Sequence, residues 1–366
     1  MYPLNLAQPY PKNQWWVGAL SSEVGRSLFA RRILGEPIVF YRKLSGEPVA
    51  MHGLCPHRLY PMVHGTVVED EVRCGYHGFS FDGCGRCVNV PSQQSVPRNF
   101  KIKMYPVEEK GGFVWIWTGA AKMADSAKIP SPEGVFQPGW DTDLTSVATY
   151  PSRYALLIDN LFDLTHLGFV HSSIMGEVNV FVKTTATITQ SDATLTMARD
   201  ARSCDWGPFN DFLFGPDGGK QFDVFAVSTY FGPCLTLTGT RFRQTAQQSP
   251  TSRERNLGNL WFIHAMTPET PNSTHYFGGV ARDFRLGDPG FSAAQVASFE
   301  AVRLQDIQTL AAIEPYVNDF ASTRTELSTA QDEGAIKVRR LLATQIKSEA
   351  CQQDRSASVA QASHSV

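Results

Sequence analysis

The sequence predicts an α+β protein with a β-rich N-terminal domain over residues 1–120 and a larger mixed domain over residues 121–350. Short β-branched and aromatic runs separated by glycines fill the first region. The second region combines strand-like runs with amphipathic helical stripes. The remaining residues, 351–366, are rich in Ser, Ala and Gln, a composition typical of a disordered tail. At 366 residues the chain is long enough for two domains with separate cores.

Three runs in the first region have the composition of strands. They are Pro37–Tyr41, Glu71–Arg73 and Gly112–Trp117, which are rich in β-branched and aromatic residues. Four glycines within residues 75–85 predict tight loops between the second and third of these runs.

The second region begins with a helical segment and continues with strands. The segment Leu156–His171 has the apolar spacing of a helix. The runs Phe222–Tyr230, Leu235–Phe242 and Asn259–Met266 then predict three strands.

Two helices follow these strands. Ser292 and Gln295 have the form of a capping box, and an apolar stripe continues from there to Ile313. A second amphipathic helix is predicted over Ala335–Ile346.

Composition and charge exclude several kinds of partner. The chain carries 33 basic and 35 acidic residues, a formal charge of −2, with no dense basic block. We therefore expect neither a nucleic-acid nor an anionic-membrane partner. No apolar run approaches the ~20 residues of a membrane-spanning helix, and the N-terminus does not resemble a signal peptide, so a cytoplasmic location is expected.

The first metal-binding pattern combines two Cys–His pairs. Cys55-Pro-His57 is followed, after sixteen residues, by Cys74-Gly-Tyr-His77. Two thiolates and two imidazoles are the donor set of a Rieske-type [2Fe–2S] cluster, with the cysteines on one iron and the histidines on the other. A Cys₂His₂ zinc site uses the same ligand types, but zinc fingers usually pair Cys with Cys and His with His along the chain.

A CxxC sequence follows the second Cys–His pair. Cys84-Gly-Arg-Cys87 could form half of a zinc site or a redox pair. The chain contains no second CxxC, so we interpret this one as a hairpin turn with two reduced thiols.

The second metal-binding pattern lies in the helical segment. Asp159, Asp163 and His166 are spaced i, i+4 and i+7, so a continuous helix would place them on one face. His171 would lie about 140° from His166 on a straight helix, so both could reach one ion only if the helix bends, which Gly168 would allow.

Asp306 is the candidate carboxylate for this second site. Two histidines and one carboxylate make the facial triad of non-haem Fe(II) oxygenases. Asp306 interrupts the apolar stripe of the predicted helix rather than its polar face, and core aspartates are rarely unpaired. The alternative interpretation is a helix-edge aspartate paired with Arg303.

With both patterns in place, the chain resembles the Rieske non-haem iron oxygenases, most closely the oxygenase component of vanillate O-demethylase and its relatives. The resemblance extends over nearly the whole chain. It depends on both metal-binding patterns and on three further motifs, Asn13-Gln-Trp-Trp-Val, Gly35-Glu-Pro-Ile-Val-Phe-Tyr and Lys337-Val-Arg-Arg-Leu-Leu.

The resemblance implies an N-terminal Rieske domain and a C-terminal helix-grip catalytic domain with an antiparallel sheet. It assigns Cys55, His57, Cys74 and His77 to the cluster, and His166, His171 and Asp306 to a mononuclear iron. Asp163 matches the aspartate that connects the two centres across subunits of a head-to-tail trimer. Asn160 matches a position near the iron.

The resemblance also implies partners and an activity. Electrons would come from NAD(P)H through a separate reductase with flavin and a plant-type iron–sulfur centre. The implied reaction is hydroxylation or O-demethylation of a vanillate-like methoxyarene with O₂, with methyl or ring hydroxylation of another aromatic as the alternative. An electron carrier without oxygenase activity is the alternative from a different class. The similarity is weakest over residues 175–250, which should line much of the substrate pocket. Aromatic and apolar residues there would suit a planar aromatic ring, although each of them is more often simply a core residue: Trp206, Phe209, Phe212, Phe214, Phe231 and Leu237.

Overall fold

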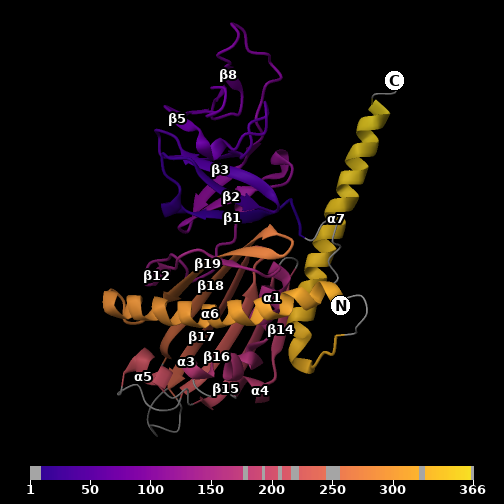
Figure 1. Ribbon diagram of the computed structural model, residues 1–366. Helices are drawn as coiled ribbons and strands as arrows, with labels where there is room; N and C mark the ends of the chain where they lie inside the picture. Colours follow the sequence, from indigo (N-terminus) through magenta and orange to yellow (C-terminus); the bar gives the residue numbers. More distant parts are fainter. Residues whose placement is uncertain are drawn as a thin grey trace. The chain divides into compact units, whose positions relative to one another are not determined.

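The computed structural model describes residues 10–175, 180–191, 194–204, 208–215, 222–244, 256–320 and 326–363. The chain forms two compact units (Figure 1). The N-terminal unit contains Tyr10–Ile129 together with Thr267–Pro271, and the C-terminal unit contains residues 130–266 and 272 onward. The α+β fold class is confirmed.

The N-terminal unit contains three small antiparallel sheets. The first has the strand order β1 (Trp15–Leu20), β11 (Phe113–Trp117), β10 (Val107–Lys110). The second has the order β2 (Phe29–Ile33), β3 (Glu36–Arg42), β4 (Pro48–His52), β9 (Met104–Tyr105). The third has the order β5 (Thr66–Val68), β6 (Glu71–Arg73), β7 (Ser80–Phe81), β8 (Cys87–Asn89). The three strands predicted for this region are confirmed as β3, β6 and β11.

One core cluster of the N-terminal unit lies between the second and third sheets. Val39 and Tyr41 of β3 alternate along the strand, so both side chains enter this core from the same face. Val72 of β6 meets them from the other sheet, and the cysteines Cys55 and Cys74 belong to the same buried cluster. The loops that carry these cysteines are therefore anchored in the core.

The C-terminal unit is built on one eight-stranded sheet. Its order is β12 (Asp141–Leu144), β19 (Ser273–Arg282), β18 (Asn256–Thr270), β17 (Leu235–Gln244), β16 (Phe222–Tyr230), β15 (Leu195–Cys204), β14 (Thr187–Gln190), and β13 (Ala148–Tyr150) also pairs with β19. Strands β16 to β18 contain the three predicted strands, paired antiparallel as expected.

Residues 267–271, which end β18 and begin the turn to β19, belong to the N-terminal unit. The carbonyls of Pro268 and Glu269 accept hydrogen bonds from the backbone N–H groups of Leu34 and Gly35, at 2.8 and 2.9 Å. The Thr267 hydroxyl donates to the Val17 carbonyl at 2.7 Å. The N-terminal unit is thus completed by residues that lie far along the chain.

Helix α6 (Pro289–Phe320) runs across one face of the sheet (Figure 1). Phe299 of α6 stacks on Phe262 of β18 with ring centroids 5.4 Å apart. A helix gripped by an antiparallel sheet is the architecture that the resemblance implies, and it is confirmed.

The predicted start of α6 is wrong by one turn. Asp288 is the residue that caps the helix, because its carboxylate accepts from the Phe291 N–H at 2.9 Å. Pro289 then occupies the first helical position, where a backbone N–H would have no partner within the helix, so proline loses no hydrogen bond there. Ser292 lies inside the helix, and its hydroxyl accepts from Arg282 at 3.0 Å instead of forming a capping box with Gln295.

The predicted helical segment 156–171 is divided into three pieces. Helix α1 (Tyr154–Phe162) ends at Asp163, a 3₁₀ turn covers Leu164–His166, and α2 (Leu167–Val170) follows. Asp163 has φ −117° and ψ 89°, and its carboxylate accepts from the Thr165 N–H at 2.9 Å, so this residue caps the next turn.

Shorter helices and α7 complete the C-terminal unit. The short helices are α3 (Ser172–Met175), α4 (Val180–Lys183) and α5 (Pro208–Phe214). Helix α7 (Glu333–Ser363) packs against α1 and includes the predicted helix over residues 335–346. It continues past residue 350 into the segment for which the sequence predicts disorder, where alanine and glutamine favour helix. Within the described residues, no helix combines the length and apolar character that crossing a membrane requires.

Candidate metal centres

Two loops of the N-terminal unit have the same backbone geometry. Residues 55–57 follow β4, and residues 74–77 connect β6 to β7. In both loops the cysteine N–H donates to the carbonyl five residues later, and the cysteine carbonyl accepts from the N–H four residues later. The fourth residue after each cysteine, Leu59 or Gly78, has a left-handed φ of 56° or 73°. The two loops therefore share one backbone conformation, and each presents one cysteine and one histidine.

The donor atoms in these loops divide into a buried pair and an exposed pair. Cys55 and Cys74 are each 2% exposed, whereas His57 and His77 are exposed with ring centroids 4.6 Å apart. Burial, followed by the neighbouring Cys74 thiol, raises the pKa of Cys55 to about 11. A buried thiolate pair needs cations beside it, and a binuclear iron cluster supplies them. The donor set fits a [2Fe–2S] group with two thiolate and two imidazole ligands.

The CxxC sequence forms a hairpin turn, as predicted. Cys87 begins β8, which pairs with β7, and the Asp82 carboxylate accepts from the N–H groups of Cys84 and Arg86 at 2.9 Å. No disulfide joins Cys84 to Cys87 among the described residues.

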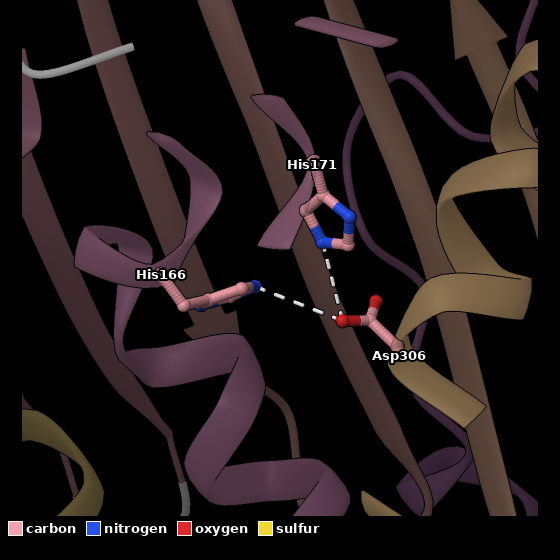
Figure 2. A group of neighbouring side chains, drawn as sticks. All are labelled: His166, His171 and Asp306. Carbon is pink, nitrogen blue, oxygen red and sulfur yellow. Dashed lines mark ion pairs between the residues drawn. The ribbon is translucent and has the colours of Figure 1, made fainter. Parts of the chain in front are cut away.

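The second centre lies in the C-terminal unit, where two short helical elements meet α6. His166 closes the 3₁₀ turn, His171 follows α2, and Asp306 comes from the middle of α6 (Figure 2). Asp306 Oδ1 lies 3.8 Å from His166 Nε2 and 3.2 Å from His171 Nε2. The three predicted residues therefore converge, with one ligand atom from each within 4.8 Å of the others.

Two buried atoms at this centre lack hydrogen-bond partners in the described part of the chain. They are His171 Nε2 and Asp306 Oδ1. Burying polar atoms without partners costs free energy, and a metal ion between them would remove that cost. Two imidazoles and a carboxylate on one side of an ion fit the facial triad of a non-haem iron site, which leaves the opposite side open.

Each imidazole is oriented by a hydrogen bond through its other nitrogen. Nδ1 of His166 contacts the backbone carbonyl of Asp163, and Nδ1 of His171 lies 2.8 Å from Oε1 of Gln305. Burial lowers the pKa of His166, whereas Asp306 overcomes the effect of burial and raises the pKa of His171. The sequence did not reveal Gln305, because nothing in its local pattern marks a contact with a residue 134 positions away.

The bend between the two histidines does not depend on Gly168. The chain departs from helical geometry at Asp163 and again at His171, which has φ −105° and ψ 13°. Asp159, Asp163 and His166 line one pocket, as the spacing predicts, although the helix that carries them is interrupted at Asp163. The Asp159 carboxylate forms a two-point ion pair with Arg339 of α7 at 2.7 and 2.8 Å.

The interpretation of Asp306 as a partner of Arg303 is not supported. Arg303 pairs with Glu300 at 3.2 Å and donates to the Ser146 carbonyl at 2.7 Å. Asp306 is therefore directed to the histidines.

A largely apolar cavity of about 120 Å³ opens beside the three converging residues. His166, His171 and Asp306 form part of its wall, and Asn160 lies in the same wall. Six phenylalanines from several elements supply much of the remainder: Phe181, Phe209, Phe212, Phe242, Phe262 and Phe299.

The expected pocket residues are partly correct. Phe209 and Phe212 line the cavity, but Phe214 packs on the core side of α5 against other aromatic rings. Phe231 and Leu237 are not part of the cavity wall, and Trp206 lies outside the described residues.

The cavity also contains polar groups that the sequence did not reveal. His264 on β18 is 5% exposed, and its Nε2 lies 2.8 Å from the Thr238 hydroxyl. Its Nδ1 contacts the Tyr276 hydroxyl. Burial lowers the pKa of His264 to about 3, so the ring is neutral at ordinary pH. A single histidine in a strand gave no pattern from which this role could be predicted.

Comparison with known proteins matches both units. Residues 14–106 match the Rieske [2Fe–2S] domain, and residues 150–348 match the vanillate O-demethylase oxygenase C-terminal domain. The iron–sulfur subunit of a toluene-4-sulfonate monooxygenase system from Comamonas testosteroni is 30% identical over 92% of this chain and 97% of its own. The oxygenase component of dicamba O-demethylase from Stenotrophomonas maltophilia is 29% identical over 90% and 96%.

A solved structure agrees with these sequence matches. The crystal structure of dicamba monooxygenase bound to dicamba superposes with a TM-score of 0.81 at 27% identity, covering 93% of this chain and 98% of that one. The C-terminal match alone covers more than half of the chain. The chain belongs to the Rieske non-haem iron oxygenases of the vanillate O-demethylase type, which hold a [2Fe–2S] cluster and a mononuclear iron.

Proposed function

We propose that this chain is the terminal oxygenase of a multicomponent system, and that its substrate is an aromatic compound such as a methoxyarene. The observation that carries the proposal is the apolar cavity beside the triad of His166, His171 and Asp306. The relatives support it, because they include an O-demethylase oxygenase component and a subunit of an arenesulfonate monooxygenase system.

The proposed ligands follow the geometry of the two centres. In a Rieske domain over residues 1–120, the cluster would be held by Cys55, His57, Cys74 and His77. In a catalytic domain over residues 121–350, the iron would be held by His166, His171 and Asp306, with Asn160 and Asp163 beside it. Bound there, the iron would supply activation of O₂ at its open side.

The cavity suits a single aromatic ring. A dry cavity of roughly 150 Å³ lined by apolar side chains accommodates benzene, and the cavity here is of similar size at about 120 Å³. Phe262 and Phe299 stack together in its wall and offer flat apolar surfaces. The neutral His264 and the Tyr276 hydroxyl are among the polar groups of the wall that could orient a polar substituent. The chain's own residues thus exclude water and position the ring.

The proposed reaction is O-demethylation. A methoxyarene, O₂, two electrons and two protons would give a phenol, formaldehyde and water. The electrons would come from NAD(P)H through a separate reductase. Asp163 is proposed to join the two centres of neighbouring subunits in a head-to-tail trimer; within this chain its backbone carbonyl contacts His166 and its carboxylate accepts from Thr165.

Two other functions make different predictions. Methyl or ring hydroxylation would use the same residues and yield a hydroxylated product without formaldehyde. An electron carrier would not need a second donor set with buried unpaired atoms, so the geometry of the triad favours the oxygenase.

The test begins with metal content and proceeds to turnover. Anaerobically purified protein is expected to contain about three irons and two sulfides per chain, given one [2Fe–2S] cluster and one iron. His166→Ala should reduce the iron to about two per chain and leave the Rieske EPR signal unchanged. With a Rieske-system reductase and NADH, vanillate and related methoxyarenes are then screened for formaldehyde. Zinc without sulfide would contradict the proposal, and a hydroxylated product without formaldehyde would replace demethylation with hydroxylation.

A further inference from the structure

We infer that Gln305 is a positioning residue, which determines which nitrogen of His171 faces the metal site. This inference rests on the proposed function, in which His171 is an iron ligand. Gln305 immediately precedes Asp306 on α6, so two adjacent residues of one helix act on opposite nitrogens of the same imidazole.

The Gln305 amide contacts His171 with its oxygen and Ser173 with its nitrogen. Its oxygen lies 2.8 Å from Nδ1 of His171, and its nitrogen donates to the Ser173 hydroxyl at 2.9 Å. An amide oxygen can only accept, so the imidazole proton belongs on Nδ1. Nε2 then presents its lone pair toward Asp306, as a metal ligand must.

The opposite orientation of the same amide would disable the site. If the nitrogen of Gln305 faced His171, Nδ1 would have to accept and the ring proton would move to Nε2. That nitrogen could then no longer bind a metal. A hydrocarbon side chain at position 305 could not accept the Nδ1 proton of His171. The imidazole would then not be held in one tautomer and one orientation, and metal binding would be weaker because the metal would have to impose both.

The two histidines differ in how they are held. His166 is oriented by the backbone carbonyl of Asp163, which no side-chain substitution removes. His171 depends on a side chain from another element, through a contact that also connects α3 to α6 at Ser173. The metal site is therefore more sensitive to substitution of Gln305 than its place outside the triad suggests.

The experiment measures Fe(II) affinity in the full-length protein with its cluster intact. The mononuclear iron is removed with a chelator, and Fe(II) is titrated back anaerobically by calorimetry. Gln305→Leu should raise the Fe(II) dissociation constant by about 10- to 100-fold, the usual cost of losing such a contact. Gln305→Glu retains an acceptor for Nδ1 and should bind within about threefold of the wild type.

Two controls separate positioning from packing. Ser173→Ala retains the contact with His171 and should stay within about threefold of the wild type. Gln308→Leu removes an exposed amide from the same helix and should have no effect. Wild-type affinity in Gln305→Leu would overturn the inference, as would equal loss in Gln305→Leu and Gln305→Glu. If the wild-type protein itself binds no Fe(II) at this site, the proposed function fails first.

Discussion

Asp306 Oδ1 and His171 Nε2 lie 3.2 Å apart in the C-terminal unit, at ion-pair distance, and both are buried without a hydrogen-bond partner among the described residues. The ion pair has its full charge only when His171 is protonated. This arrangement is costly for the folded protein without metal and is useful only when a cation lies between them. The two groups therefore lower the stability of the metal-free protein and at the same time provide ligands for the metal.

The first prediction concerns the effect of Asp306 on the stability of the metal-free protein. Asp306→Leu should abolish iron binding at the second centre and, in the metal-free state at a pH where His171 is neutral, stabilise the protein by about 1–3 kcal/mol, because the buried Oδ1, which has no hydrogen-bond partner among the described residues, is removed. Thermal unfolding of chelator-treated wild type and variant measures the difference. A metal-free variant less stable than the metal-free wild type would show that Asp306 has a structural role instead.

The second prediction concerns the ion pairs between α1 and α7. Arg339 binds Asp159 and Glu326 through two-point contacts of 2.6 to 3.0 Å, and its side chain is 12% exposed. Arg339→Ala should destabilise the protein by about 3–5 kcal/mol, because it removes the two-point ion pair of the largely buried Asp159 carboxylate. Arg340→Ala, which removes the neighbouring exposed arginine, is the matched control. Equal unfolding midpoints in urea for the two variants would contradict the prediction.

The third prediction concerns stability at low pH. The pKa of His264 falls from its ordinary 6.5 to about 3 on folding. Below pH 6.5 the unfolded chain binds a proton that the folded protein does not, so stability falls as the pH decreases from 6.5 towards 3. The slope for this one group is about 1.4 kcal/mol per pH unit.

His264→Gln isolates the contribution of this group. The variant should lack that part of the pH dependence, which urea unfolding at pH 4.5, 5.5 and 6.5 can measure. Parallel curves for variant and wild type would show that His264 titrates normally in the folded protein.

The fourth prediction concerns a close contact within the sheet. A Cβ on Gly239 would lie 1.9 Å from a ring atom of Trp261 and 2.5 Å from the Leu260 carbonyl oxygen. Gly239→Ala should therefore cost about 1–3 kcal/mol or more through overpacking. Gly25→Ala, where nothing lies within 4 Å and φ is not positive, is the control and should change stability by less than about 0.5 kcal/mol. If Gly239→Ala leaves the free energy of unfolding unchanged, β17 and β18 must be able to move apart.

The sequence predicted the metal ligands because their chemistry is marked locally. Cys55 and Cys74 each lie two or three residues before a histidine, and few structures other than a metal site need that spacing. Asp306 was found because it interrupts an apolar stripe. These signals depend on short windows of sequence, and the strands β16 to β18 were predicted from short windows in the same way.

The residues that the sequence missed are defined by contacts across the fold. Gln305 and His264 look like an ordinary helix glutamine and an ordinary strand histidine until the folded chain brings partners to them. The start of α6 was misplaced because Asp288 and Ser292 are both good capping residues. The choice between them is made by Pro289 and by Arg282, which binds the Ser292 hydroxyl.

The turn between β18 and β19 limits how this protein can be recombined with its relatives. Residues 267–271 supply acceptors to the N–H groups of Leu34 and Gly35, although they are encoded within the catalytic half of the chain. A chimera made with a single crossover near residue 130 would combine a Rieske domain from one parent with this turn from the other. To exchange the whole N-terminal unit, the five residues 267–271 must be replaced together with residues 10–129. Gene shuffling within the family should therefore favour crossovers that keep these two distant stretches from the same parent.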